Sequence, residues 1–461
     1  MLKESILALF LLILPAGLAA QDIEKDAQKP ARDEALQQQT EGLADETAKR
    51  AAPGADVTWG EVMARPDDLR LNYRYAREQV RRGDLKGAAA TLERILMVDP
   101  NQNEVRLFYA VVFYRLDNLA EARRELDILR TLPLPGALRE EANRYVLAVS
   151  RRAKRTRILG SLSTGFEYDT NRNAAPSSGR ALFGDTDYIL TGNSRRRADT
   201  SVLFMGNAGV RHELDTQARH EIFGNLNYYQ VEQTLAKDLN LKAYSAQAGG
   251  VYKAGFLQVT PEILFDHVEL AQSTFLRNRG ADIRLDVPYH RKANFYCEVR
   301  DVMQDYVATA GVPKAPERTG VQVDITGGSE HFLGPVMKLG TLLGYTRKDA
   351  RQDYWAFSRW VAGVNHTWLL GRGAFGLSSF TFNYDIYNAP DQTLSSIMRR
   401  DKTLRVSGTL GAPLSFIHPR LDDLILTVTY EYYQALSNVK NYAYTNNKIA
   451  GLLAYRWEVG L

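Results

Sequence analysis

The residue types that carry out catalysis or bind metals are scattered along this chain. Its seven histidines occur singly, and no two have the spacing of a metal-binding HExxH motif. Neither a GxSxG nucleophile motif nor a phosphate-binding GxxxxGK[ST] loop is present. The single cysteine, Cys297, shares a strand face with Phe295 and Val299, as a small apolar residue would. We therefore expect a protein that is not an enzyme and that uses no cofactor and no metal.

Composition narrows the class of protein further. The 461 residues carry a formal net charge of only +4, which argues against a dedicated nucleic-acid binder, where a concentrated basic stripe is expected. Beyond residue 20, no apolar run approaches the roughly 18 residues that a membrane-spanning helix needs. Strands that cross a membrane escape such a scan, because half of their residues are polar.

From about residue 157 onward, apolar and polar residues alternate, which is the period of two expected of strands. The alternation is clear in the segments 380–385, 403–410 and 424–432. About fourteen such strands are expected, centred near residues 164, 205, 226, 248, 263, 282, 299, 325, 342, 362, 380, 409, 428 and 452. One apolar and one polar face repeated in this way favours an antiparallel barrel with lipid outside and water inside. A large soluble all-β domain is the alternative.

The connections between these strands alternate in length. The long, polar connections are Asn171–Ala198, Tyr306–Thr319, Asn388–Arg400 and Leu436–Thr445. The tight ones are Lys253–Phe256, Phe332–Val336, Leu370–Gly373 and Ile417–Leu421. Outer-membrane barrels combine long external loops with short periplasmic turns. With an even number of strands, both ends of the barrel segment are expected on the periplasmic side.

The segment before the barrel has three parts. Residues 1–20 are expected to be a secretory signal, because Lys3 precedes an apolar core and small residues follow it. Residues 21–56 are rich in Gln, Glu, Asp, Lys and Ala, which predicts a flexible linker. Residues 57–155 are expected to form an all-α domain in the periplasm, and residues 156–461 the barrel.

A repeat of 34 residues marks the helical domain. Residues at matching positions of the two units are Tyr75 and Tyr109, Ala76 and Ala110, and Ala88 and Ala122. This period, with alanines where helices cross, is typical of tetratricopeptide repeats. Gly83 fits the turn between helices, where a left-handed backbone is required. Such domains usually bind peptides or partner proteins on a concave surface.

Taken together, a signal, a tetratricopeptide-type domain and a barrel resemble the surface lipoprotein assembly modifiers, called Slam proteins. The resemblance spans nearly the whole chain after the signal. Its most specific part is the segment Tyr168–Pro176, which is similar to the family motif at the end of the first barrel strand. The residues that carry the resemblance are Tyr168, Asp169, Asn171, Asn173, Pro176, Arg400, Asp401, Pro419, Ser437 and Asn438. The chain departs from the family in ending on Glu458–Leu461 rather than on an aromatic residue.

The resemblance implies an outer-membrane protein of a Gram-negative bacterium that delivers client proteins to the cell surface. Its clients would be surface lipoproteins or related secreted proteins. The helical domain would capture the client, and the barrel would be the conduit. Outer-membrane lipid, periplasmic chaperones and the barrel assembly machinery are the other expected partners. A polysaccharide exporter, a diffusion porin with periplasmic repeats and a lipid-modifying barrel enzyme are the alternatives.

Overall fold

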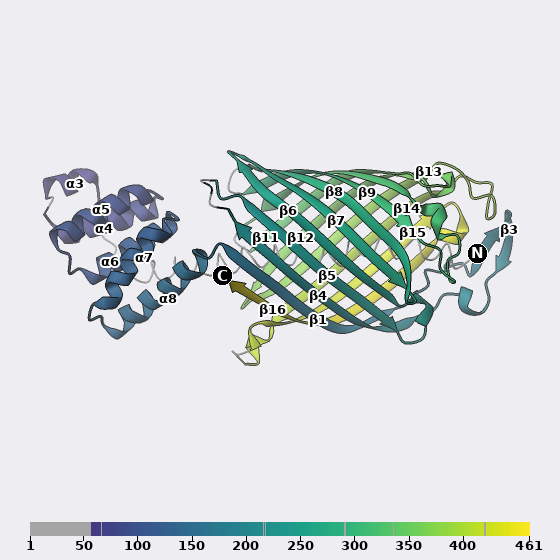
Figure 1. Cartoon of the computed structure of the whole chain (residues 1–461), viewed down its shortest axis with the longest axis horizontal. Coiled ribbons are helices and arrows are strands. Elements are labelled where there is room, and N and C mark those ends of the chain that lie inside the picture. Colours follow the sequence, from purple (N-terminus) through teal and green to yellow (C-terminus); the bar gives the residue numbers. More distant parts are fainter. Residues whose placement is uncertain are drawn as a thin grey trace. The chain divides into compact units, whose positions relative to one another are not determined.

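The computed structural model describes residues 57–461, apart from residues 66, 215, 217, 290, 291, 335, 419 and 420, with only the backbone described at 151 and 152. The expected signal and linker therefore lie outside the described residues. The structure divides into two compact units, one of helices up to Arg155 and one of strands from Thr156 to Val459 (Figure 1). Among the described residues, no helix is both long and apolar enough to cross a membrane.

From residue 57 onward, where the chain is described, the helical unit has six helices. They are α3 (Trp59–Ala64), α4 (Leu69–Arg81), α5 (Leu85–Val98), α6 (Asn103–Arg115), α7 (Leu119–Thr131) and α8 (Gly136–Arg152). Asp68, Asp84 and Asn118 begin α4, α5 and α7 by accepting a hydrogen bond from a backbone N–H in the first turn. Gly83 has the expected left-handed backbone, with a φ of 83°, and Asp117 adopts a φ of 62° at the matching position 34 residues later.

Two apolar cores hold these helices together. Ala76, Ala88 and Tyr109 lie in one core, and Ala110 and Ala122 lie in the other. The four alanines are almost fully buried, which allows neighbouring helices to approach closely. Tyr75 is partly buried and packs against a third small cluster, which contains Val62 of α3.

The second unit is a closed antiparallel barrel of fourteen strands. In chain order the strands are β1 (Thr156–Asp169), β4 (Asp199–Glu213), β5 (Glu221–Gln233), β6 (Leu241–Ala254), β7 (Leu257–Leu270), β8 (Ser273–Tyr289), β9 (Ala293–Tyr306), β10 (Gly320–Phe332), β11 (Met337–Lys348), β12 (Phe357–Gly371), β13 (Ala374–Tyr387), β14 (Arg400–Pro413), β15 (Leu424–Ser437) and β16 (Tyr444–Gly460). All fourteen predicted centres fall inside these strands, so the predicted fold class is confirmed.

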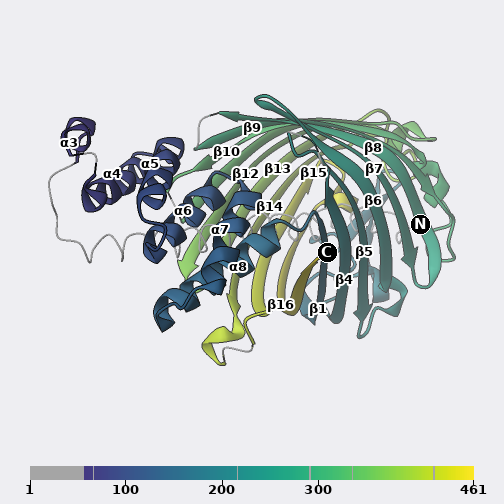
Figure 2. The same ribbon diagram turned by 60° about the vertical axis from the view of Figure 1, so that its left-hand side comes forward.

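Each strand pairs with its neighbours in the chain, and β1 closes the barrel by lying between β16 and β4 (Figure 2). The contact between β1 and β16 is close. A Cβ built on Gly165 of β1 would lie 1.9 Å from the carbonyl oxygen of Gly451 in β16, so no larger residue fits there without a shift. Closure pairs the strand edges that would otherwise be open.

The two faces of the barrel wall differ in chemistry. One face of each strand carries exposed apolar side chains such as Leu343, Trp360 and Leu410, and we call it the outer wall. The other face carries buried polar side chains, and we call it the inner wall. On the inner wall, for example, Arg359 of β12 donates two hydrogen bonds of 2.6 Å to Asp385 of β13. This division matches the alternation of the sequence.

The two ends of the barrel also differ. At the long-loop end lie the connections 170–198, 307–319, 388–399 and 438–443, and at the short-turn end lie tight turns such as Gly255–Phe256. Two connections break this pattern. Residues 414–423 join β14 to β15 at the short-turn end, where a tight turn was expected at 417–421, and Ala271 and Gln272 alone join β7 to β8 at the long-loop end. Both have positive φ, 47° and 68°, as in a two-residue hairpin turn of type I′.

Within the first long loop, residues Arg180–Phe183 (β2) and Thr186–Ile189 (β3) form a separate hairpin. This hairpin was not predicted. Gly184 and Asp185 join its strands with φ of 56° and 63°, the values of a type I′ turn. A Gly-Asp pair between two short apolar runs is a hairpin signal, so the sequence did contain this information.

Candidate functional site

The family-like residues after β1 form a tightly bonded turn. The Asn171 backbone N–H donates to Asp169 Oδ1 at 2.8 Å, and the Ala175 N–H donates to Asn171 Oδ1 at 3.0 Å. Asn171 Nδ2 donates to the carbonyl of Ala175 and, at 3.2 Å, to the carbonyl of Thr445 in β16. Asp169, Asn171 and Asn173 are each at most 3% exposed. The turn is therefore a buried part of the long-loop end and is tied to the last strand.

Asn173 fixes the return of the same loop. Its Nδ2 donates to the carbonyls of Asn193 and Arg195, and its Oδ1 accepts from the Arg197 N–H at 3.0 Å. Because a buried asparagine with unpaired groups would be costly, these three bonds specify one loop conformation.

A buried cluster of charges lies directly beneath this turn. Arg172 Nη1 is 2.7 Å from Glu167 Oε1 and 3.5 Å from Asp169 Oδ2. Lys448 of β16 approaches the same Asp169 oxygen at 3.8 Å. On the neighbouring inner wall, Arg405 and Glu431 form a further pair at 3.7 Å. These contacts link the first loop to the first barrel strand, β1, and to the last, β16.

The hairpin β2–β3 extends this network to the loop before β14. The Asp185 carboxylate accepts hydrogen bonds from the Ser395 hydroxyl at 2.6 Å and from the Ser396 N–H at 3.1 Å. The backbone N–H groups of Gly184 and Asp185 donate to the carbonyls of Thr393 and Leu394.

The same hairpin also contacts the loop between β15 and β16. Asn441 Oδ1 accepts from the Leu182 N–H at 2.7 Å, and its Nδ2 donates to the Leu182 carbonyl at 3.0 Å. The side chain thus pairs with the hairpin as a strand backbone would. Leu182 also packs against buried Leu394, Val439 and Tyr442.

The remaining family-like residues complete the site. Arg399 forms an ion pair with Asp401 and stacks on Tyr387, with its guanidinium carbon 4.3 Å from the ring centre. Asn438 accepts from the Arg400 N–H at 2.7 Å and donates to the Met398 carbonyl. We name the turn 169–175, the hairpin β2–β3, residues 393–401 and residues 438–442 the mouth cluster.

The structure thus brings most of the predicted residues to one end of the barrel. Asp169, Asn171, Asn173, Pro176, Arg400, Asp401, Ser437 and Asn438 all lie there. Tyr168 is on the outer wall, 46% exposed, and takes no part in the network. Pro419 lies outside the described residues. What these residues do remains a prediction.

Sequence reasoning missed several members of the mouth cluster. Arg172 and Arg399 lie in the family-like segments but were not singled out, and Asp185 and Asn441 were missed. Only the Gly-Asp turn pointed to Asp185. Nothing in the local sequence marks Asn441, because its partner Leu182 is some 260 positions away. Among the described residues, no group of three or more His, Cys, Asp or Glu side chains could hold a metal ion.

Comparison with known proteins supports the two-part architecture. A tetratricopeptide repeat family model matches residues 79–130, which fall within α4 to α7. No curated protein matches the chain. The fold and site together define a class: a tetratricopeptide-type helical unit joined, on one chain, to a closed 14-stranded barrel.

Among solved structures, the chain is similar to outer-membrane proteins. OmpT of Vibrio cholerae is 9% identical, with a TM-score of 0.38, and the match covers 66% of this chain and 97% of OmpT. The anion-selective porin from Comamonas acidovorans is 8% identical, with a TM-score of 0.35, over 66% of this chain and 99% of the porin. OccAB1 of Acinetobacter baumannii is 7% identical, with a TM-score of 0.37, and the match covers 66% of this chain and 97% of OccAB1.

Proposed function

We propose that this chain is an outer-membrane translocator that delivers client proteins, surface lipoproteins or related secreted proteins, to the cell surface. The helical unit captures the client in the periplasm, and the barrel is the conduit. The observation that carries the proposal is the joint presence of a tetratricopeptide-type unit and a barrel whose long-loop end is bridged by its own first loop. The chain needs no catalytic group for this role.

The outer wall supports a place in the membrane. A closed barrel pairs its backbone groups internally, which is a condition for crossing hydrocarbon. Exposed Leu343, Leu410 and Trp360 on the outer wall are 60 to 70% accessible, and water would not favour such a surface. An outward apolar band closed into a ring is what lipid requires. The two ends of the barrel segment then lie at the short-turn end, on the periplasmic side.

The mouth cluster supports regulated passage rather than a permanently open pore. The hairpin β2–β3 is bound through Asp185 to Ser395 and through Asn441 to the last loop. A client must displace these contacts before it leaves the barrel. Since most of them are single hydrogen bonds, each worth roughly 0.5–1.5 kcal/mol, a folding client outside can supply the free energy to hold the mouth open.

The helical unit supports capture of a polypeptide. Helical repeats of this kind stack into curved surfaces that bind extended or helical segments. The described unit has two tetratricopeptide-type hairpins, α4–α5 and α6–α7, followed by α8. This surface is small, which suits a short exposed segment of a client better than a whole folded domain.

Surface proteomics tests the proposal. Cells lacking the chain are compared with cells that carry the full chain or a variant lacking residues 66–155. We expect a defined set of proteins to leave the surface without the chain and to return only with the full chain. Heat-dependent gel mobility serves as the control that the truncated barrel still folds. Unchanged export by the truncated variant would contradict the capture role.

The same cells distinguish the main alternative. A diffusion porin would support uptake of small solutes and would show steady conductance in planar bilayers. We expect the intact chain to show low conductance, because the mouth cluster bonds the first loop across to the last two long loops. A steady, high conductance with no change in surface proteins would replace the translocator by a porin.

A further inference from the structure

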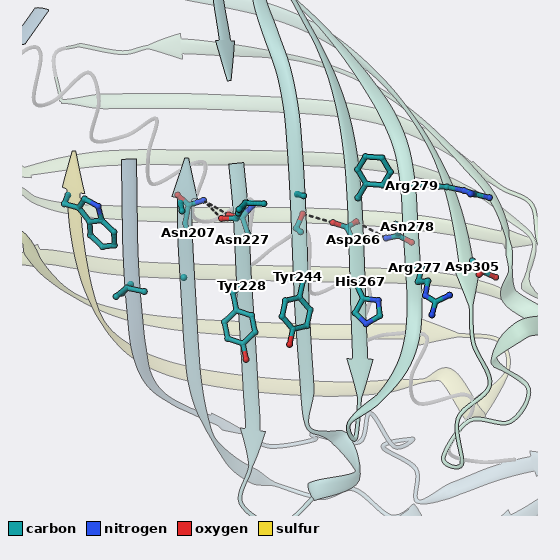
Figure 3. A pocket seen from close by; sticks show the side chains of 18 residues that line it. Asn207, Asn227, Tyr228, Tyr244, Asp266, His267, Arg277, Asn278, Arg279 and Asp305 are labelled. Atoms are coloured by element: carbon teal, nitrogen blue, oxygen red, sulfur yellow. Dashed lines mark hydrogen bonds between the residues drawn. The ribbon is translucent and has the colours of Figure 1, made fainter. Parts of the chain in front are cut away.

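A groove of about 950 Å³ crosses the outer wall of the barrel, from β1 and β16 to β8 and β9 (Figure 3). Small residues make room for it, since Gly206, Ala208 and Ala246 face outward where other strands carry large side chains. The apolar part of the groove is formed by Leu162, Gly206, Ala208, Leu226, Ala246, Phe265 and Trp457. This lining offers an apolar surface to a hydrocarbon chain.

Aromatic side chains line the middle of the groove. Tyr228, Tyr244 and His267 lie on β5, β6 and β7, directly opposite one another in register. Their ring centres are 5.2 Å and 6.0 Å apart. Aromatic rows of this kind mark the interface between hydrocarbon and head groups in membrane barrels.

Two arginines and one aspartate form the far end of the groove. Arg277 and Arg279 on β8 are exposed, and they alternate with the inner-wall residue Asn278, so they face outward with Ile283. Within the described part of the chain, neither arginine has an ion-pair partner. Asp305 of β9 stands opposite Arg277 in register, but no ion pair of 4 Å or less joins them. An outward arginine in a barrel costs about 2–4 kcal/mol at the bilayer midplane and about 0–1 kcal/mol near the interfaces.

The groove runs obliquely along the wall. Arg277 is four residues from the start of β8, at the long-loop end. Leu162 is seven residues from that end of β1, and Trp457 is near the short-turn end of β16. A ligand would therefore place its head at the outer rim and its chain toward the middle of the wall.

We propose that this groove binds an ethanolamine phospholipid. The phosphate lies between Arg277 and Arg279, the ammonium group donates to Asp305, and an acyl chain follows the apolar part of the groove. The head group must offer both signs of charge, because the protein offers both within one pair of neighbouring strands. Cβ atoms of residues opposite each other on paired strands are roughly 5 Å apart, so one head group can reach Arg277 and Asp305 together. The inference rests on the proposed place of the barrel in the membrane and is independent of client export.

Native mass spectrometry of the full chain in detergent tests the inference. The protein is titrated with phosphatidylethanolamine, phosphatidylcholine and phosphatidylglycerol. We expect phosphatidylethanolamine to bind at least about tenfold more tightly than phosphatidylcholine, whose quaternary ammonium has no N–H to donate. The double variant Arg277→Gln/Arg279→Gln should bind phosphatidylethanolamine about tenfold or more weakly, since charge-assisted hydrogen bonds are removed. Asp305→Asn should lose the preference for phosphatidylethanolamine over phosphatidylglycerol.

Two further variants control the experiment. Gly206→Val fills the groove without touching the head-group site; a Cβ there meets Leu162 at an ordinary 3.5 Å, so the barrel should fold and bind the lipid more weakly. Arg347→Gln removes another outward-facing arginine, on β11, which is paired with Asp349 and lies outside the groove. It should bind as the unmodified chain does.

The inference is wrong if the double variant binds as the unmodified chain does, or if Arg347→Gln weakens binding equally. It is also wrong if the double variant dissociates an oligomer without changing lipid binding, because the groove would then face a second copy. Membrane fractionation separates this failure from that of the proposed function. A chain absent from the membrane fraction would end both proposals, whereas a membrane-inserted, exporting chain without lipid selectivity would end only this one.

Discussion

Arg172 is the most deeply buried basic side chain of the mouth cluster, and we predict that it holds the first loop in place. Its guanidinium lies between two carboxylates, 2.7 Å from Glu167 and 3.5 Å from Asp169, and its side chain is only 3% exposed. Replacing it with Met keeps the approximate volume but leaves two buried carboxylates without their cation. Breaking a buried ion pair from one side costs about 3–5 kcal/mol. Lys448, 3.8 Å from Asp169, compensates in part, so we expect about 3 kcal/mol.

This loss should appear as local opening of the first loop. The Arg172 N–H donates to the carbonyl of Arg197, and the Ala174 N–H to the carbonyl of Asn171, so these amides report closure. A change of 3 kcal/mol corresponds to roughly 100-fold faster hydrogen exchange, at about 1.4 kcal/mol per factor of ten. Conductance in planar bilayers should rise in parallel, because the hairpin β2–β3 is released.

The matched control is Arg180→Met on the same loop. The Arg180 side chain is 55% exposed, and its ion pair with Asp187 is long, at 3.9 Å. This pair should therefore contribute no more than about 1 kcal/mol to the stability of the loop. Exchange at Arg172 and Ala174 should change little in this variant. If Arg172→Met left exchange and conductance unchanged, the buried charges would not be what holds the mouth closed.

Three further predictions concern packing and pH. Ala122→Leu should destabilise the helical unit by about 1–3 kcal/mol through overpacking, measured by thermal unfolding, whereas Ala120→Leu, on the exposed face of the same helix, should have little effect. Hydrogen bonds from Ser395 and Ser396 hold the pKa of Asp185 below its ordinary value. The stabilisation from its carboxylate is therefore present at neutral pH and is lost as the pH falls below about 4. Proteolysis of the hairpin should increase in acid, and Asp185→Asn should lack this acid dependence. Burial, with the Glu93 carboxylate nearby, raises the pKa of Tyr109 to about 12. The contribution of this side chain to the stability of the helical unit is therefore complete below pH 10 and is lost between pH 10 and 12. The alkaline loss of helical circular dichroism should be smaller in Tyr109→Phe.

The fold could be predicted largely because its signals are local. Alternation of period two specified the strands, and the 34-residue repeat specified the helical hairpins, including the left-handed turn at Gly83. These patterns reflect how a backbone presents side chains to one face or the other, and that geometry is the same wherever the strand or helix lies. The Gly-Asp turn at 184–185 was an equally local signal that was overlooked.

The candidate site was only partly predictable. The family-like motif pointed to Asp169, Asn171 and Asn173, but their partners come from β16 and from loops far along the chain. The contact between Asn441 and Leu182, and that between Lys448 and Asp169, exist only once β1 and β16 become neighbours. No pattern in a single sequence encodes which residues barrel closure will bring together.

The sequence alone therefore determined the number of barrel strands, the helical repeat and the polar and apolar faces of the wall, because each follows from side-chain periodicity. Only the tertiary structure decided that the first loop bonds to the last two, and that Arg277, Arg279 and Asp305 border one outward groove. Both depend on the register and closure of fourteen strands. Pairing of distant strands is set by the whole ring, whereas alternation within a strand is set by its own residues.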